Sequence, residues 1–149
     1  MIMNALSIIV RYSRNFSERK MKPFDIGFPE QVVLMYLSQH DGINQDAIAH
    51  HFMIDKGAIA KTIGKLEEKG HIEKSPNKEN KRENLISLTS KGKSMLGLMN
   101  NVLEEWNDGM MDGLSREEIE QFNRIAEKIE ANVLKIFNQN WSDTDAKAE

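Results

Sequence analysis

The chain has 149 residues, of which 40% are hydrophobic and 29% are charged, with a net charge of −3. This is enough apolar side chain to build the core of one compact domain, so disorder throughout is excluded. The absence of cysteine excludes disulfide scaffolds, thiolate zinc sites and thiol nucleophiles. The sequence shows neither a secretory signal nor a run of about 20 apolar residues, so we expect a cytoplasmic protein without a membrane span.

The charge is unevenly distributed along the chain. Residues 44–93 carry ten basic and seven acidic side chains, whereas residues 94–149 carry five basic and twelve acidic ones. Because salt screens charges beyond about 8–10 Å, a binding partner senses the sign of the face it contacts. The acidic average therefore does not exclude a nucleic-acid partner for the basic middle of the chain.

The N-terminal part is predicted to form two helices. Apolar residues recur every three or four positions from Ile2 to Phe16, and the helix is expected to end before Pro23. Pro29 favours the first turn of a second helix, which Asp41 and Gly42 end.

Two short helices are predicted next, over residues 45–52 and 56–69. Asn44 and Asp55 are their expected N-caps. Only residues 53–55 join them, so the two helices should cross sharply, which is typical of a helix-turn-helix. The expected inner faces are Ala47, Ile48 and Phe52 in the first helix and Ile59, Ile63 and Leu66 in the second.

The period then changes from helix to strand. Residues 71–74 and 85–89 are predicted to be strands, and residues 75–84 between them are polar or charged apart from one proline, which predicts a hairpin with a long basic tip. Two long helical patterns fill residues 90–140, and Ser115 with Glu118 forms the capping box of the second. Residues 141–149 are expected to be a disordered tail.

A helix-turn-helix followed by a charged hairpin is a winged helix, so the expected fold is mainly α with a small β-hairpin wing, and residues 28–92 form its DNA-binding part. The second helix of such a pair fits the major groove of DNA, and a basic hairpin tip reaches phosphates or the minor groove. The candidate DNA-binding residues on the helix are Lys56, Lys61, Thr62 and Lys65, with small residues at Gly57, Ala58 and Ala60 that admit close approach. Those on the hairpin tip are Lys78, Lys81 and Arg82.

Several stretches resemble the multiple-antibiotic-resistance regulators, the MarR family. They are Gly27-Phe28-Pro29-Glu30-Gln31, Gln45-Asp46-Ala47-Ile48-Ala49, Asp55-Lys56-Gly57-Ala58-Ile59, Leu66-Glu67-Glu68-Lys69-Gly70, and Asn80-Lys81-Arg82 with Leu85-Ile86-Ser87-Leu88-Thr89-Ser90-Lys91-Gly92. Two departures are visible. Asn80 stands where the family usually has Asp, and Gly57, Ala58 and Ala60 stand where its recognition helix often has hydroxyl side chains.

The resemblance implies a single domain over residues 1–149 and a DNA-binding transcriptional regulator. Residues 1–22 and 93–140 are expected to be dimerisation helices, because they are too long and apolar for a monomer of this size to bury. A homodimer would place its two recognition helices in successive major grooves of a pseudo-palindromic operator, about 34 Å apart. Repression and release by a small-molecule effector follow from the resemblance, and the candidate effector-pocket residues are Tyr12, Phe16, Met35 and Tyr36.

Two other interpretations stay open at this point. A winged-helix module could use its lysine face to bind an acidic protein, since a basic helix face alone is also compatible with a solvated surface. A metal-responsive regulator would need zinc at His40, His50 and His51, but these show no H-E-x-x-H spacing, and surface or cap roles are expected. No nucleophile motif, glycine-rich phosphate loop or cofactor motif is present, so an enzyme is not expected.

Overall fold

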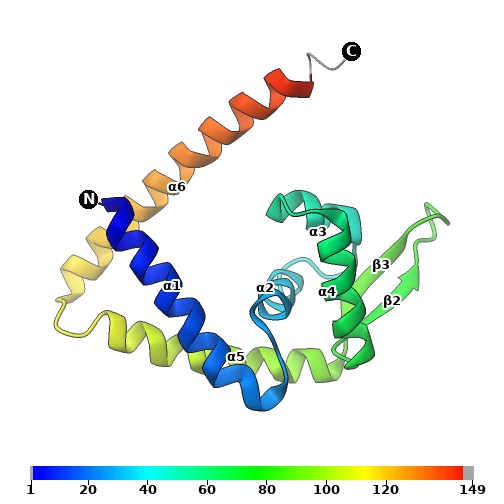
Figure 1. The fold of residues 1–149 in the computed structure, drawn as a ribbon, viewed down its shortest axis with the longest axis horizontal. Coiled ribbons are helices and arrows are strands. Elements are labelled where there is room, and N and C mark those ends of the chain that lie inside the picture. Colours follow the sequence, from blue (N-terminus) through cyan, green and yellow to red (C-terminus); the bar gives the residue numbers. More distant parts are fainter. Residues whose placement is uncertain (1, 146–149) are drawn as a thin grey trace. The chain divides into compact units, whose positions relative to one another are not determined.

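The structure is a computed structural model that describes residues 2–145, with side chains described as far as residue 136. It is mainly helical with one small antiparallel sheet, as the sequence predicted (Figure 1). Contacts divide the chain into two units at the Asn107–Asp108 bond. In order, the elements are α1 (Ile2–Met21), the 3-10 helix η1 (Lys22–Phe24), α2 (Phe28–Leu37), β1 (Ile43–Asn44), α3 (Gln45–Phe52), α4 (Lys56–Glu68), β2 (Ile72–Pro76), β3 (Asn84–Leu88), α5 (Ser90–Met110) and α6 (Arg116–Asp145).

The helix-turn-helix forms through the expected caps. The Asn44 side chain accepts a hydrogen bond from the backbone N–H of Ala47 at 2.8 Å, and that of Asp55 accepts one from Ala58 at 3.1 Å. One expectation for α3 is wrong: Ala47 is exposed, and Ala49 is buried beside Ile48. Position 49 lies about 200° around the helix from position 47, and α3 packs with that other side inward.

The sheet contains a strand that the sequence analysis missed. Its order is β1-β3-β2, and β1 pairs antiparallel with β3 through Ile43 opposite Ile86 and Asn44 opposite Leu85. The hairpin strands are also longer at the tip than expected, because β2 runs to Pro76 and β3 starts at Asn84. The two-residue strand β1 therefore joins the start of α3 directly to the wing.

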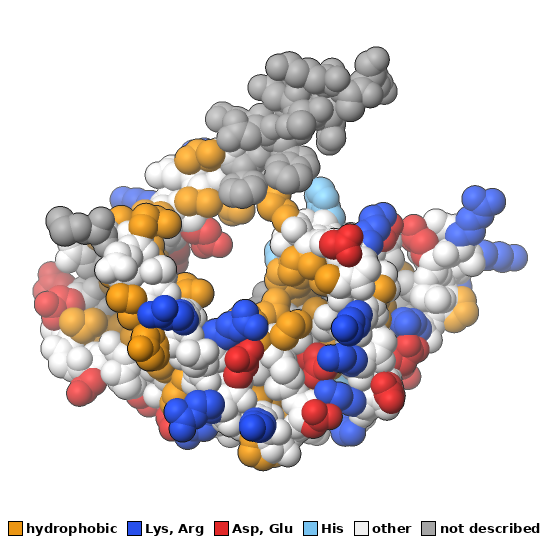
Figure 2. Space-filling view, in the orientation of Figure 1, with side chains coloured by type: hydrophobic (Ala, Val, Ile, Leu, Met, Phe, Trp, Pro, Cys, Tyr) orange, Lys and Arg blue, Asp and Glu red, His pale blue; other side chains and the backbone are white. Residues whose placement is uncertain are grey.

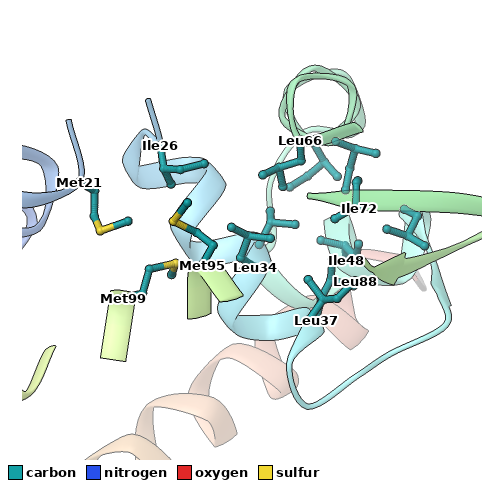
Figure 3. Packing of buried hydrophobic residues seen from close by; sticks show 14 of the residues in the cluster. Met21, Ile26, Leu34, Leu37, Ile48, Leu66, Ile72, Leu88, Met95 and Met99 are labelled. Carbon is teal, nitrogen blue, oxygen red and sulfur yellow. The ribbon is translucent and has the colours of Figure 1, made fainter. Parts of the chain in front are cut away.

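The core lies where α2, α3, α4 and the sheet meet the end of α1 and the start of α5. Figure 3 shows Leu34 between two groups of these side chains, with Met21, Met95 and Met99 on one side and Leu66 on the other. The inner face of α4 is as predicted, because Ile59, Ile63 and Leu66 are each at most 3% exposed. Each Å² of apolar surface removed from water contributes roughly 25 cal/mol to stability, so the burial of these three side chains fixes the position of α4.

A partly buried ion pair joins α2 to the end of α4. The Glu30 carboxylate is nearly buried, receives the backbone N–H of Gly27 at 3.2 Å, and lies 2.9 Å from the Lys69 ammonium. Burial lowers the pKa of Lys69, but hydrogen bonds and charge from Glu30 and Asp25 outweigh it, so the pKa lies above the ordinary 10.5. The cation therefore stays charged, and α2 and α4 are held at their ends.

A second junction connects α4 and β2 to the first turn of α5. Thr89 donates its backbone N–H to the carbonyl of His71 at 3.1 Å and its hydroxyl to the carbonyl of Gly70 at 2.7 Å. Gly92 packs so closely that a Cβ there would lie 2.1 Å from the His71 carbonyl oxygen. Only glycine allows this approach. We call these four residues the α4–α5 junction.

In the C-terminal unit, Ser115 and Glu118 form the expected capping box at the start of α6. The Glu118 carboxylate accepts the backbone N–H and the hydroxyl of Ser115, both at 2.8 Å, and these hydrogen bonds lower the pKa of Glu118. Helix α6 includes residues 141–145 of the expected tail, and residues 146–149 lie outside the described residues. None of the described helices is long and apolar enough to span a membrane.

Candidate nucleic-acid interface

Helix α4 presents one side to solvent along its whole length. Its buried residues recur at positions 59, 63 and 66, and the 3.6-residue period places the remaining positions outward. The predicted binding residues follow this division: Lys56, Gly57, Ala58, Ala60, Lys61 and Lys65 are exposed, and Thr62 is half-buried. The structure therefore brings these seven residues together on the outer part of one helix.

The start of α4 has no side chain at Gly57 for a local reason. A Cβ there would lie 2.8 Å from the Asp55 carboxylate oxygen that caps the helix. Glycine leaves this carboxylate room to receive the Ala58 N–H, and it also leaves the helix end narrow. A narrow, capped end with exposed backbone and methyl groups can approach base edges closely.

Two lysine side chains at or beside the outer face of α4 form ion pairs with carboxylates. Lys56 pairs with Asp46 of α3 at 2.8 Å, and both side chains are largely exposed. Lys74 of β2 pairs with Glu67 of α4 at 2.6 Å. The described contacts of Lys61 and Lys65 include no ion pair, so these two can meet an anionic partner without displacing a carboxylate.

The wing tip is a loop closed by its own hydrogen bonds. Asn77 donates its backbone N–H to the Glu83 carbonyl at 3.0 Å, and Glu83 donates its own to the Asn80 carbonyl at 3.0 Å. The Asn80 side-chain oxygen accepts the backbone N–H of Arg82 at 3.2 Å. This loop exposes Lys78, Lys81 and Arg82, as the sequence predicted.

Figure 2 shows Lys and Arg side chains along α4 and at the tip of the hairpin, with acidic side chains between them. The hairpin extends away from the helices beside α4 (Figure 1). Two basic elements of different shape therefore lie on one side of the N-terminal unit. A helix of this width fits the major groove, and an extended hairpin reaches the adjacent backbone or minor groove.

The four candidate effector residues do not lie together. Met35 and Tyr36 line a cavity of about 390 Å³ between α1, α2, α3 and α5, whereas Tyr12 and Phe16 line neither this cavity nor the larger one described below. Ser13 and Ser17 are the α1 residues that face it, and Phe16 instead packs on Trp106 of α5 with ring centroids 5.3 Å apart. Residues one position apart on a helix point about 100° apart, which explains the difference.

A larger cavity, of about 530 Å³, was not anticipated from the sequence. Its floor is apolar, with Phe28, Val32 and Ile54, and Arg14 lies over the Phe28 ring at 5.0 Å. Helix α4 forms one wall with four of the candidate DNA-binding residues, Ala58, Lys61, Thr62 and Lys65. The sequence signal that could have indicated it is Ile54, a hydrophobic residue in the short turn between the two predicted helices, which the structure shows to be exposed.

The three histidines considered for metal binding are exposed and, in the part of the chain that the structure describes, belong to no cluster of three or more metal-ligating side chains. His40 and His51 each stack on the Tyr36 ring at 4.2 Å. His71, which the sequence analysis did not single out, is 2% exposed, and among the described atoms its Nδ1 has no hydrogen-bond partner. Burial, followed by the charge of Lys91, lowers the pKa of His71.

Helices α3 and α4 form a capped helix-turn-helix, and the β2–β3 hairpin that follows pairs with β1, which precedes α3. This arrangement defines a winged helix-turn-helix protein. The sequence model of the MarR family matches residues 29–84, which contain the helix-turn-helix and the first strand of the hairpin. The uncharacterised HTH-type transcriptional regulator YybA of Bacillus subtilis (strain 168) is 26% identical over 132 residues, covering 89% of this chain and 88% of that protein.

Solved structures agree over nearly the whole chain. A MarR transcriptional regulator from Methanosarcina mazei Go1 is 30% identical, with 91% of this chain and 97% of that chain covered and a TM-score of 0.85. A MarR-family regulator from Listeria monocytogenes, solved in complex with a 26mer DNA, is 25% identical, with 89% of each chain covered and a TM-score of 0.80. The chain belongs to the MarR family of transcriptional regulators.

Proposed function

We propose that the protein is a transcriptional repressor that binds a pseudo-palindromic DNA operator as a homodimer and is released by a small-molecule effector. One observation carries this proposal: α4 presents Lys61 and Lys65 beside a narrow, capped N-terminus, next to a basic wing. The related Listeria monocytogenes protein was solved with a 26mer DNA.

The two basic elements have different roles in this proposal. The start of α4 reads base edges, partly through contact of alanine methyl groups with thymine methyl groups, and Lys65, one turn further from it than Lys61, meets phosphate. Arg82 at the wing tip enters the minor groove, where narrow A·T-rich segments concentrate negative potential.

Exposed apolar side chains support the homodimer. In α1, Ile2 and Val10 are 61% and 66% exposed, and α6 exposes a stripe at every third or fourth position. A contiguous apolar stripe of this length marks an interface rather than an ordinary surface. In α6 the stripe consists of Phe122, Ile125, Ile129, Val133 and Ile136. We assign both helices to the contact with a second copy of this chain.

The two cavities support effector release. The larger one shares a wall with the DNA-reading surface, so a bound molecule there competes with DNA for Lys61 and Lys65. Its apolar floor and cationic rim, which includes Arg14, fit an aromatic or aliphatic acid. Repression follows if the operator overlaps a promoter.

The experiment begins with sequencing of the genomic fragments that the purified protein retains. Binding to a recovered duplex is then measured over a range of salt concentrations for wild-type protein, Lys65→Ala, Arg82→Ala and the charge-matched control Lys22→Ala, in which an exposed lysine of η1 is lost. Lys65→Ala should weaken specific and non-specific binding alike and lower the salt slope by about one, whereas Lys22→Ala should change neither.

Arg82→Ala should cost roughly 1–3 kcal/mol more on an A·T-rich flank than on a G·C-rich one. Equal losses on both flanks would mean that the wing only contacts phosphate. Binding without salt dependence, or an equal effect of the η1 control, would refute the assignment of the DNA-binding surface and favour an acidic protein as the partner.

A further inference from the structure

We propose that Glu83 is a positioning residue for DNA recognition, which fixes the wing to the N-terminus of α3 through Asn44; this inference rests on the proposed function. The Asn44 side-chain amide donates to the Glu83 carboxylate at 3.2 Å. The same side chain accepts the Ala47 backbone N–H through its oxygen at 2.8 Å. Both residues are half-buried.

Asn44 suits this double role because its amide carries an acceptor and a donor on two different atoms. An aspartate would cap α3 equally well, but it has no donor for a second carboxylate. The contact also follows from the sheet that the sequence analysis missed, since β1 places Asn44 opposite Leu85, two residues after Glu83.

Glu83 is the residue through which the wing loop can be oriented as a whole. Its backbone closes the loop with Asn77 and Asn80, and its neighbour is Arg82, the residue proposed to enter the minor groove. Of the side-chain hydrogen bonds that the structure describes for residues 77–83, the one from Asn44 is the one that reaches the helix-turn-helix. A wing held before DNA arrives loses less conformational entropy on binding.

Two ion pairs extend the same connection. Glu67 of α4 holds Lys74 of β2 at 2.6 Å, and Asp46 of α3 holds Lys56 of α4 at 2.8 Å. The recognition helix, the helix before it and the wing are therefore linked in a closed path of polar contacts. The Asn44–Glu83 hydrogen bond is the link nearest to the wing tip.

The carboxylate also has an effect that opposes its positioning role. A negative charge beside Arg82 repels phosphate, so removal of the charge alone should not weaken DNA binding. Removal of the hydrogen bond should weaken it. These two effects can be separated because glutamine keeps an acceptor for Asn44 and alanine does not, while both lose the same charge.

The test therefore compares Glu83→Ala with Glu83→Gln on a duplex that the wild-type protein recovers from fragmented genomic DNA. Glu83→Gln should bind as tightly as wild type or more tightly. Glu83→Ala should bind roughly three- to tenfold more weakly than Glu83→Gln, which is the value of one hydrogen bond. Backbone amide exchange at residues 77–83 of the free protein should be faster in Glu83→Ala than in Glu83→Gln, and the thermal midpoint should fall by no more than the few degrees that one hydrogen bond contributes.

A double variant that exchanges the hydrogen-bond donor and acceptor between positions 44 and 83 should restore DNA binding. Asn44→Asp keeps the α3 cap but sets two carboxylates against each other, so it should weaken binding and accelerate exchange in the loop. In the double variant Asn44→Asp/Glu83→Gln the introduced glutamine amide donates to the introduced carboxylate, and the net charge equals that of wild type. Its affinity should return to within about twofold of wild type.

Equal binding and equal exchange in Glu83→Ala and Glu83→Gln would overturn the positioning role, as would failure of the double variant to recover. If wild-type protein retains no DNA, the proposed function fails, and the exchange comparison alone then decides whether Glu83 orders the wing.

Discussion

Gly92→Ala should destabilise the protein strongly, although it replaces a glycine near the start of a helix by the best helix former. A Cβ at position 92 would lie 2.1 Å from the carbonyl oxygen of His71, against an ordinary contact of 3.4 Å or more. The obstacle is backbone, so relief requires α5 to move by about 1 Å and to strain the Thr89–His71 hydrogen bond. Overpacking and loss of that bond together cost about 2–4 kcal/mol.

The matched control is Gly97→Ala in the same helix, where the added Cβ would meet nothing within 4 Å beyond its chain neighbours and the backbone of its own helix. It should stabilise by about 0.5–1 kcal/mol through helix propensity. Urea and thermal unfolding, at one fixed protein concentration because the proposed dimer makes stability concentration-dependent, measure both variants. For a chain of this length we expect a midpoint about 5–15 °C lower for Gly92→Ala and about 2–3 °C higher for Gly97→Ala. Equal shifts, or a loss below about 1 kcal/mol at position 92, would refute the close approach of α5 to His71.

Three further predictions concern stability and assembly. Lys69→Met should lower the free energy of unfolding in urea by about 2–3 kcal/mol, because it leaves the buried Glu30 carboxylate without its cation. The double variant Lys69→Met/Glu30→Gln should recover part of that loss, and no recovery would contradict the pairing. The pKa of His71 is lowered in the folded state below its ordinary 6.5, so its contribution to stability is present above pH 6.5 and is lost as the pH falls below that value. The free energy of unfolding of His71→Leu should therefore depend less on pH than that of wild type between pH 6.5 and 5. Identical profiles would show that His71 does not cause the pH dependence. Light scattering should give about 34 kDa, twice the chain mass of 17.1 kDa, and a stable monomer at micromolar concentration would exclude the proposed dimer.

The features that the sequence predicted correctly depend on near neighbours. Asn44, Asp55 and the Ser115–Glu118 pair cap their helices through contacts three residues apart, and such short-range chemistry can be read from a sequence. The buried positions of α4 followed from their spacing in the same way. The exposure of the basic residues of α4 and the wing tip could be predicted because they lie on the outer sides of elements whose period was clear.

The features that were missed depend on partners far along the chain. Strand β1 has two residues, too few to show any period, and it exists because Ile86 pairs with Ile43 across more than forty positions. With an alanine on either side of Ile48, the spacing alone did not decide which one faces inward. Of the four candidate effector residues, Met35 and Tyr36 line the smaller cavity, whereas the rotation of α1 against α2 and α5 directs Ser13 and Ser17 toward it in place of Tyr12 and Phe16.

The α4–α5 junction couples the orientation of α4 to that of α5. Thr89 and Gly92 attach the C-terminal end of α4 to α5 without a flexible link, so a rotation of α5 is transmitted to α4 rather than absorbed between them. Helix α4 has 13 residues and is therefore about 20 Å long. A tilt of about 5° at the junction moves its N-terminus by about 1.7 Å, half of the 3.4 Å that separates successive base pairs. On the proposed mode of DNA binding, a tilt of this size is therefore large enough to shift the N-terminal end of α4 out of register with the bases that it contacts.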